Sequence, residues 1–185
     1  MFGRSTGGLT VLRSASPPAC HERVGGISFL VRSDGTTGEE WVERLLAGGF
    51  RVGRYARDLL RSPRFVSTTG VTTRVAVLKG ALFEDGNRFT ENIRDEAAQR
   101  GLLTPTAEVA CLIREKFADE EIKTMGLWFV ATMHEPINDS DGDSDLLIAH
   151  RGGDGRWLSA YSQRAEVRWR RDSGFAFAVA TYRLV

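Results

Sequence analysis

Apolar residues recur with helical spacing in two segments that follow Asp34-Gly35. In the first, Thr37 can accept a hydrogen bond from the amide of Glu40, whose side chain can reach back, as in the capping box of many helices. Its predicted buried stripe consists of Trp41, Leu45 and Leu46. The second helix is expected over 52–61, before Pro63. One face of it carries apolar residues at helical spacing, namely Val52, Tyr55, Ala56, Leu59 and Leu60.

Three further helices are predicted over 89–100, 104–117 and 119–125. Thr90 is the expected cap of the first helix, and Asp119 is the expected cap of the third. The middle helix begins with Thr104-Pro105, a cap followed by a proline in the first turn. The segment 71–83 mixes two patterns, but its alternating Val and Thr residues favour a strand as far as Lys79.

From Leu127 onward the apolar spacing changes from a helical repeat to a two-residue repeat. The runs LWFVATMH, LLIAH, RWLSAY and FAFAVATY are short and rich in aromatic or branched residues, as strands are. RGGDG and RRDSG are typical of hairpin connections. We therefore expect an α+β fold, in which helices of the N-terminal two thirds pack on a C-terminal antiparallel sheet.

Length and composition indicate one folded domain over residues 32–185. The chain has 185 residues, of which 42% are hydrophobic and 26% are charged, as in ordinary globular proteins. Residues 1–31 contain glycine pairs, serines and Pro17-Pro18 without periodicity, which predicts a poorly ordered N-terminal arm. No apolar run approaches the roughly 20 residues that cross a bilayer. The N-terminus also lacks the apolar segment of a secretory signal, so we expect a cytoplasmic protein without membrane contact.

Common signatures of enzymes and cofactor sites are absent from the sequence. It contains no GxSxG, GxxxxGK[ST], GxGxxG or HExxH motif. Cys20 and Cys111 are too far apart to form a CxxC pair, and both are expected to be free thiols. Ala110 and Leu112 beside Cys111 predict an inert, buried thiol. No cofactor is predicted.

Four stretches carry a resemblance to a known family: AVLKGALF, AEVACLIREKF, MGLWFVATMHEPI and WRRDSGFAFAV. They resemble a family of small uncharacterised bacterial proteins with no assigned function, over roughly residues 31–179. The resemblance implies no activity, substrate or site residue.

The most conspicuous polar feature is the segment NDSDGDSD. It brings four carboxylates into one loop around Gly142, those of Asp139, Asp141, Asp143 and Asp145. Calcium and similar hard cations bind such oxygen clusters. With Gly142 at the sixth position of an EF-hand loop, however, the first and twelfth positions are Ile137 and Ile148, so two acidic ligands are missing. The favoured interpretation is a solvated hairpin turn, with a metal site as the alternative.

Histidines lie on both sides of this loop. His134 and Glu135 end the strand that enters it, and His150 ends the strand that leaves it. A simple hairpin pairs His134 with a residue near Leu146, which puts His150 about 13 Å further along, so the two histidines are not expected to share a metal. His134 with a loop aspartate could act as a general base or metal ligand. The alternative is that His134 hydrogen-bonds to the backbone at a strand end.

A row of arginines marks the second helix. Its members face away from the apolar stripe and are Arg51, Arg54, Arg57 and Arg61. Guanidinium groups in such a row suit phosphate oxygens or an acidic partner. The alternative is the ordinary charged exterior of an amphipathic helix. The formal net charge is only +1, so the chain as a whole lacks the electrostatic footprint of a DNA-binding domain.

Aromatic residues gather in the region of predicted strands. They are Trp128, Trp157, Trp169, Phe175 and Phe177. They could form a stacking platform for bases, but the favoured interpretation is a core between sheet and helices.

Taken together, these features favour a non-enzymatic binding or regulatory module over an enzyme. Its expected contact is a polyanion or acidic partner, either a protein or a nucleic acid, bound through the arginine-lined helix. The alternative is a small metal-assisted hydrolase that uses His134, Glu135 and the 139–145 aspartate loop. The ligand and the oligomeric state do not follow from the sequence.

Overall fold

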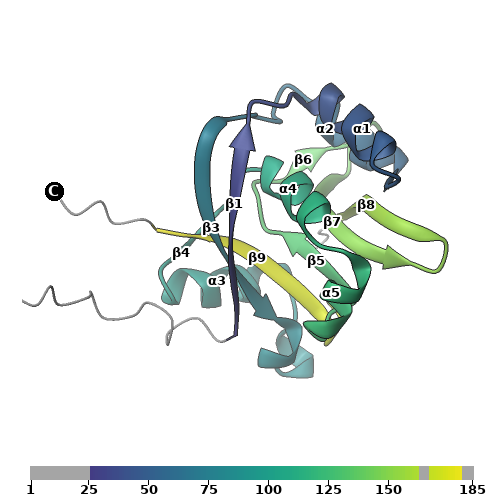
Figure 1. Cartoon of the computed structure of the whole chain (residues 1–185). Coiled ribbons are helices and arrows are strands. Elements are labelled where there is room, and N and C mark those ends of the chain that lie inside the picture. Colours follow the sequence, from purple (N-terminus) through teal and green to yellow (C-terminus); the bar gives the residue numbers. More distant parts are fainter. Residues whose placement is uncertain (1–25, 163–166, 181–185) are drawn as a thin grey trace, which may run out of the picture.

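The protein forms a strongly curled, mixed β-sheet with helices on both of its faces (Figure 1). The structure is a computed structural model that describes residues 26–162 and 167–180. Most of the predicted N-terminal arm, including Cys20, therefore lies outside the described residues. The last part of that segment, from Ile27 to Val31, belongs to the first strand.

Within the described ranges, nine strands make up the sheet. They are β1 (Ile27–Asp34), β2 (Arg51–Val52), β3 (Thr69–Lys79), β4 (Leu102–Leu103), β5 (Phe129–Thr132), β6 (Ile137–Asn138), β7 (Ser144–Gly152), β8 (Gly155–Ser162) and β9 (Ser173–Val179). Their order across the sheet is β1-β3-β9-β5-β7-β8-β2, while β4 pairs with β9 and β6 pairs with β7. Two pairs are parallel, β5 with β9 and β2 with β8, and the others are antiparallel.

The predicted fold class is therefore wrong. The sheet is mixed, and it takes four of its strands, β1, β2, β3 and β4, from the N-terminal two thirds, for which the prediction is mainly helical. The RGGDG segment does connect an antiparallel hairpin, that of β7 and β8. RRDSG does not connect a hairpin, because β9 does not pair with the preceding strand β8 but lies between β3 and β5. The result is a half-barrel rather than a stack of C-terminal hairpins.

The helices agree more closely with the sequence. They are α1 (Gly38–Ala47), α2 (Arg54–Arg61), α3 (Thr90–Gln99), α4 (Glu108–Lys116) and α5 (Asp119–Thr124), with short 3-10 turns η1 (Gly80–Leu82) and η2 (Asp85–Asn87). The capping box of Thr37 and Glu40 is confirmed. Two helices begin later than predicted: α2 begins at Arg54, because Arg51–Val52 pair as a short strand before it, and α4 begins at Glu108, after the cap residue Ala107. Thr90 and Asp119 each follow the residue that caps the helix, Phe89 and Ala118.

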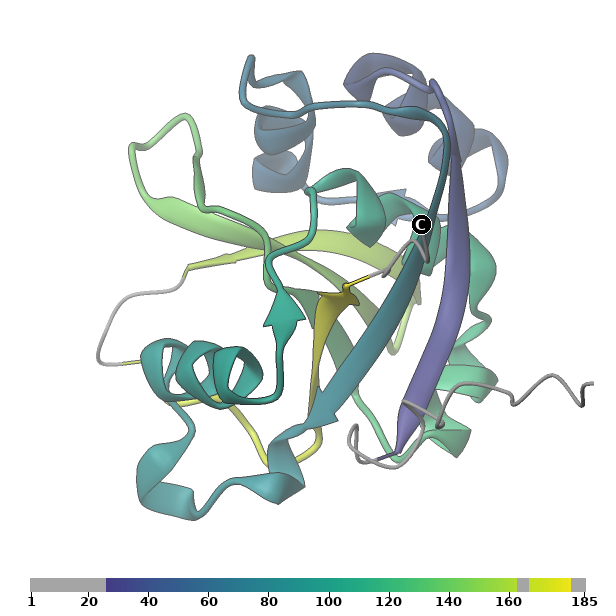
Figure 2. The same cartoon turned by 90° about the vertical axis from the view of Figure 1, so that its left-hand side faces the viewer.

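Side chains of the central strands point alternately to the two faces of the sheet and pack into two separate cores. On one face, Val75 and Val77 of β3 and Leu147 of β7 pack with apolar residues of α1, α2, α4 and α5. On the other face, Leu78 of β3 and Phe175 of β9 pack with apolar residues of α3. Figure 2 shows α3 apart from α1 and α2. Because side chains of a strand point alternately to its two faces, both faces of the sheet are apolar at its centre.

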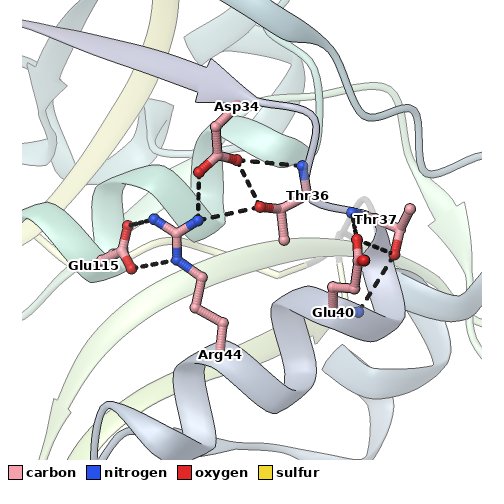
Figure 3. A network of polar contacts seen from close by, with 6 residues as sticks. All are labelled: Asp34, Thr36, Thr37, Glu40, Arg44 and Glu115. Carbon is pink, nitrogen blue, oxygen red and sulfur yellow. Dashed lines mark hydrogen bonds and ion pairs between the residues drawn. The ribbon is translucent and has the colours of Figure 1, made fainter.

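One arginine joins three elements at the edge of the first core. Arg44 of α1 donates two hydrogen bonds of 2.6 Å to the carboxylate of Glu115 on α4 and a further one to Asp34 at the end of β1 (Figure 3). Hydrogen bonds from Thr36 and Arg44 lower the pKa of Asp34 to about 2. This network fixes α1 and α4 relative to the edge strand β1.

Within the described residues, no helix combines the length and the apolar character that a membrane span needs.

Candidate functional site

The side chain of His134, which follows β5, is part of the backbone hydrogen-bond network. Its side chain is almost fully buried, Nδ1 lies 2.6 Å from the carbonyl oxygen of Glu135, and Nε2 accepts a hydrogen bond of 3.0 Å from the Leu147 amide. Nδ1 is therefore the protonated nitrogen, which donates to the carbonyl. Burial lowers the pKa of His134 to about 4. Both ring nitrogens have protein partners, and the exposed Glu135 lies outside this arrangement.

The aspartate loop folds as a turn held by its own side chains. Oδ1 of Asp139 accepts hydrogen bonds from the amides of Asp141 and Asp143, at 2.9 and 3.0 Å. Asp141 points to α2 and accepts a hydrogen bond of 2.7 Å from the Tyr55 hydroxyl. Asp145 is buried on β7. Across the described ranges, no group of three or more His, Cys, Asp or Glu side chains is arranged to hold a metal ion.

The arginine row on α2 and the residue before it is partly neutralised by carboxylates. Arg51 forms an ion pair of 3.0 Å with Asp154, and Arg61 makes two hydrogen bonds, of 2.6 and 2.8 Å, to Glu39. Arg54 is highly exposed, and its nearest carboxylate is that of Asp141 at 3.8 Å. Arg57 is half-buried. The row therefore offers an anion fewer unpaired guanidinium groups than its spacing suggests.

A more promising site is a hollow on the second face of the sheet, which we call the aromatic pocket. It has a volume of about 320 Å³. Its walls come from β5, β7, β8 and the segment before β9, and its lining residues are Trp128, Phe129, Ile148, His150, Ser159, Ala160, Tyr161, Trp169 and Arg170. The register of the sheet pairs Phe129 with His150 and Ile148 with Ser159, so these side chains share one face.

Trp169 forms the wall between this pocket and the second core. On the pocket side, the centre of its ring lies 4.9 Å from the ring centre of Tyr161 and 5.8 Å from that of Phe129. On the core side, it lies 5.5 Å from the ring centre of Phe175. The indole Nε1 donates a hydrogen bond of 3.0 Å to Oγ1 of Thr90, the first residue of α3. The Trp169 side chain is thus held in one orientation from several sides.

A polar pair lies among these rings. Nε2 of His150 lies 2.9 Å from Oγ of Ser159, and Nδ1 lies 3.3 Å from the carbonyl oxygen of Arg151. Burial is the main cause of the lowered pKa of His150, which is therefore neutral at pH 7. Because Nδ1 faces a carbonyl oxygen, it carries the proton of the neutral ring, and Nε2 accepts the hydrogen bond from the Ser159 hydroxyl. The lone pairs of the Ser159 oxygen are therefore left as an acceptor that a bound ligand can use.

Two guanidinium groups lie near the indole of Trp128 at the rim of the pocket, and one of them belongs to the lining residue Arg170. Trp128 is 39% exposed. Cζ of Arg151 lies 4.7 Å from the centre of its ring, and Cζ of Arg170 lies 6.0 Å from it. Guanidinium groups close to an indole ring are attracted by its π-electrons. Arg170 also forms an ion pair of 2.8 Å with Asp172, so this side of the entrance is mainly aromatic.

The sequence contained part of the signal for this site. The aromatic residues of the strand region divide: Phe175 and Phe177 belong to the second core, Trp128 lines the pocket, and Trp169 belongs to both. Ser159 and Tyr161 were not identified, although alternation in RWLSAY places them on the same face as Trp157. His150 had been considered only as a partner of His134. Its contact with Ser159 follows from the β7–β8 register, which the sequence does not give in detail.

Comparisons of the chain with protein-family models, with curated proteins and with solved structures find no match.

Proposed function

We propose that this protein is a binding module whose ligand is a small molecule with a planar aromatic ring, held in the aromatic pocket. The observation that carries the proposal is the convergence of four aromatic side chains on one hollow, those of Trp128, Phe129, Tyr161 and Trp169. Aromatic side chains in a concave site bind flat rings by stacking and by burying apolar surface.

The size of the aromatic pocket favours a ligand with one ring system. Its volume of about 320 Å³ lies near the lower end of the roughly 300 to 1,000 Å³ of typical ligand pockets. The neutral His150–Ser159 pair provides polar recognition at the edge of the ring. Trp169 is fixed by its bond to Thr90 and by its neighbours, so little side-chain entropy is lost when a ligand binds.

Binding of a polyanion through the arginine-lined helix stays a separate prediction, and so does the cytoplasmic location. A hydrolase built on His134 has less support, because both ring nitrogens already have partners in the protein. The aromatic pocket needs neither the helix nor the aspartate loop, since none of its lining residues comes from them.

The test is a comparison of two tyrosine variants with a panel of ring compounds. Tyr161 lines the aromatic pocket, while Tyr55 lies on α2, and the two side chains are almost equally exposed, at 39% and 37%. The panel consists of the four common ribonucleosides, riboflavin, pyridoxine, indole and benzoate, titrated by saturation-transfer NMR and isothermal calorimetry.

We expect at least one panel member to bind the wild type. Tyr161→Ala should weaken that binding about fivefold or more, because stacking on an aromatic side chain contributes about 1 to 3 kcal/mol. Tyr55→Ala should leave the affinity unchanged. Equal affinities in the wild type and in Tyr161→Ala, or no binding of any panel member, would overturn the proposal.

A further inference from the structure

Beside the aromatic pocket lies a second hollow, which we call the arginine hollow. It has a volume of about 620 Å³ and is lined by Ala81, Arg88, Gly126, Arg168, Trp169, Arg170, Arg171 and Asp172. Trp169 and Arg170 line both hollows. One short segment, 168–172, therefore forms a common border between an aromatic site and a strongly basic one.

We propose that the arginine hollow binds a phosphate group, carried by the same molecule whose ring occupies the aromatic pocket. This inference rests on the proposed function and specifies its ligand class, a phosphorylated aromatic compound such as a nucleoside monophosphate.

The charge balance of the arginine hollow leaves two guanidinium groups for a ligand. Arg88 pairs with Asp85 at 2.6 Å, and Arg170 donates two hydrogen bonds of 2.8 Å to Asp172. Arg168 and Arg171 are exposed. Within the part of the chain that the structure describes, neither side chain has a hydrogen bond or an ion pair within 4 Å, although the charges of both help to lower the pKa of Asp85, after the larger effect of Arg88. A phosphate dianion matches two such groups, since each guanidinium can donate a pair of hydrogen bonds to phosphate oxygens.

The backbone that presents these arginines is held from two sides. Nε of the buried Arg88 donates a hydrogen bond of 3.0 Å to the Trp169 carbonyl, and the Trp169 amide donates one of 2.8 Å to the Arg88 carbonyl. On the other side, the segment packs on η1 so closely that a Cβ on Gly80 would lie 2.5 Å from the Arg170 carbonyl oxygen. Arg168 and Arg171 thus extend from a fixed backbone, which lowers the entropy lost on binding.

The structure favours a small molecule over a nucleic-acid strand. The aromatic pocket holds a single ring system, whereas a protein that binds single strands presents aromatic side chains along a groove for successive bases. Binding of a single-stranded nucleic acid is one of the outcomes that the test distinguishes.

The experiment compares pairs of compounds that differ only in a phosphate. The pairs are each of the four nucleosides with its 5′-monophosphate, riboflavin with its 5′-phosphate, and pyridoxine with its phosphate, titrated by calorimetry in 50 mM and 300 mM salt. The variants are the double substitution Arg168→Gln/Arg171→Gln and the control Arg64→Gln, an exposed arginine that lines neither hollow.

We expect the phosphorylated member of at least one pair to bind about tenfold or more tightly than its partner, and this gain to shrink in 300 mM salt. The double variant should lose the gain and retain the affinity for the unphosphorylated member, while Arg64→Gln should behave as the wild type. Equal affinities within every pair would overturn the inference and leave the proposed function intact.

Three other results have distinct meanings. A phosphorylated compound that binds the double variant as tightly as the wild type would overturn the arginine hollow as its site. An eight-nucleotide single strand that binds more than a hundredfold more tightly than its monophosphate would replace the small-molecule ligand by nucleic acid. If phosphate binding needs Arg168 and Arg171 but ignores Tyr161→Ala, the proposed ring site fails and the phosphate site stands.

Discussion

The Tyr55 hydroxyl donates a hydrogen bond of 2.7 Å to Oδ2 of Asp141 and so joins α2 to the turn between β6 and β7. Arg54 lies near the same carboxylate, with Nη2 3.8 Å from Oδ1. The arginine-lined helix and the aspartate loop are therefore neighbours in space. A polyanion that approaches Arg54 also meets the negative charge of Asp141, which weakens its attraction to the helix.

The bond to Asp141 should be visible in the titration of Tyr55. It raises the pKa of the Tyr55 phenol above 10.0, first because the hydroxyl donates to a carboxylate and second because the carboxylate charge opposes the phenolate. We expect Asp141→Asn to bring this pKa back toward its ordinary value. Tyrosine absorbance or ring NMR signals followed from pH 8 to 12 will measure it, with Tyr55→Phe to assign the signal. An unchanged pKa in Asp141→Asn would mean that the hydrogen bond does not form in solution.

Charge reversal on α2 tests the arginine-lined helix directly. If it contacts a polyanion, Arg54→Glu/Arg57→Glu should reduce retention on heparin, and the difference should disappear at high salt. Arg32→Glu/Arg74→Glu, on β1 and β3, makes the same change of charge away from the helix. Equal retention of the wild type and the helix variant, or an equal loss in both double variants, would remove the helix as a specific contact.

His134 should make the protein less stable in mild acid. Its pKa is about 4 in the folded state, below the ordinary 6.5. Between these values the unfolded chain binds a proton that the folded chain does not, so the free energy of unfolding falls as the pH falls through this window. From pH 7 to pH 4.5 this group alone accounts for a loss of about 2 kcal/mol.

The measurement for His134 is urea unfolding of the wild type and His134→Gln at both pH values. Glutamine can donate and accept hydrogen bonds but does not titrate. The variant should be less stable at pH 7, yet lose about 2 kcal/mol less than the wild type on acidification. Parallel losses in the two proteins would show that His134 does not titrate as described.

Local features were predictable from the sequence because short-range contacts determine them. The Thr37–Glu40 capping box depends on residues three positions apart, and α1 follows it as predicted. A simple hairpin model was enough to predict that His134 lies opposite a residue near Leu146. In the structure, Nε2 of His134 accepts a hydrogen bond from the neighbouring amide of Leu147.

The arrangement of the sheet was not predictable in the same way. An apolar run such as FAFAVATY suits a strand in any central position, whatever its neighbours and direction. Residue alternation gives no preference between pairing β9 with β8 and inserting it between β3 and β5. The aromatic pocket depends on that choice, because Trp169 is carried to the face of β5 by the segment that leads into β9.

Gly80 should be required for the shape of both hollows. A Cβ at this position would lie 2.5 Å from the Arg170 carbonyl oxygen and 3.0 Å from that of Arg171. Gly80→Ala must therefore push the 168–172 segment outward, and we expect a loss of about 2 kcal/mol and a fall of about 5 °C in the melting temperature. Ligand affinity should fall as well.

Gly86→Ala is the matched control for this substitution, because a Cβ there meets nothing within 4 Å and the backbone conformation is ordinary. It should melt within about 1 °C of the wild type and bind ligands equally well. If the two alanine variants behave alike, the segment does not depend on its close contact with Gly80.

The indole N–H signals of the four tryptophans provide the most direct test of the aromatic pocket as the ligand site. In 1H–15N spectra, the panel compound with the highest affinity should shift the signals of Trp128 and Trp169, which line the pocket. The signal of Trp41, fully buried in the first core, should stay in place. If no panel compound moves Trp128 or Trp169, or if Trp41 shifts as far as they do, the account of this pocket is contradicted.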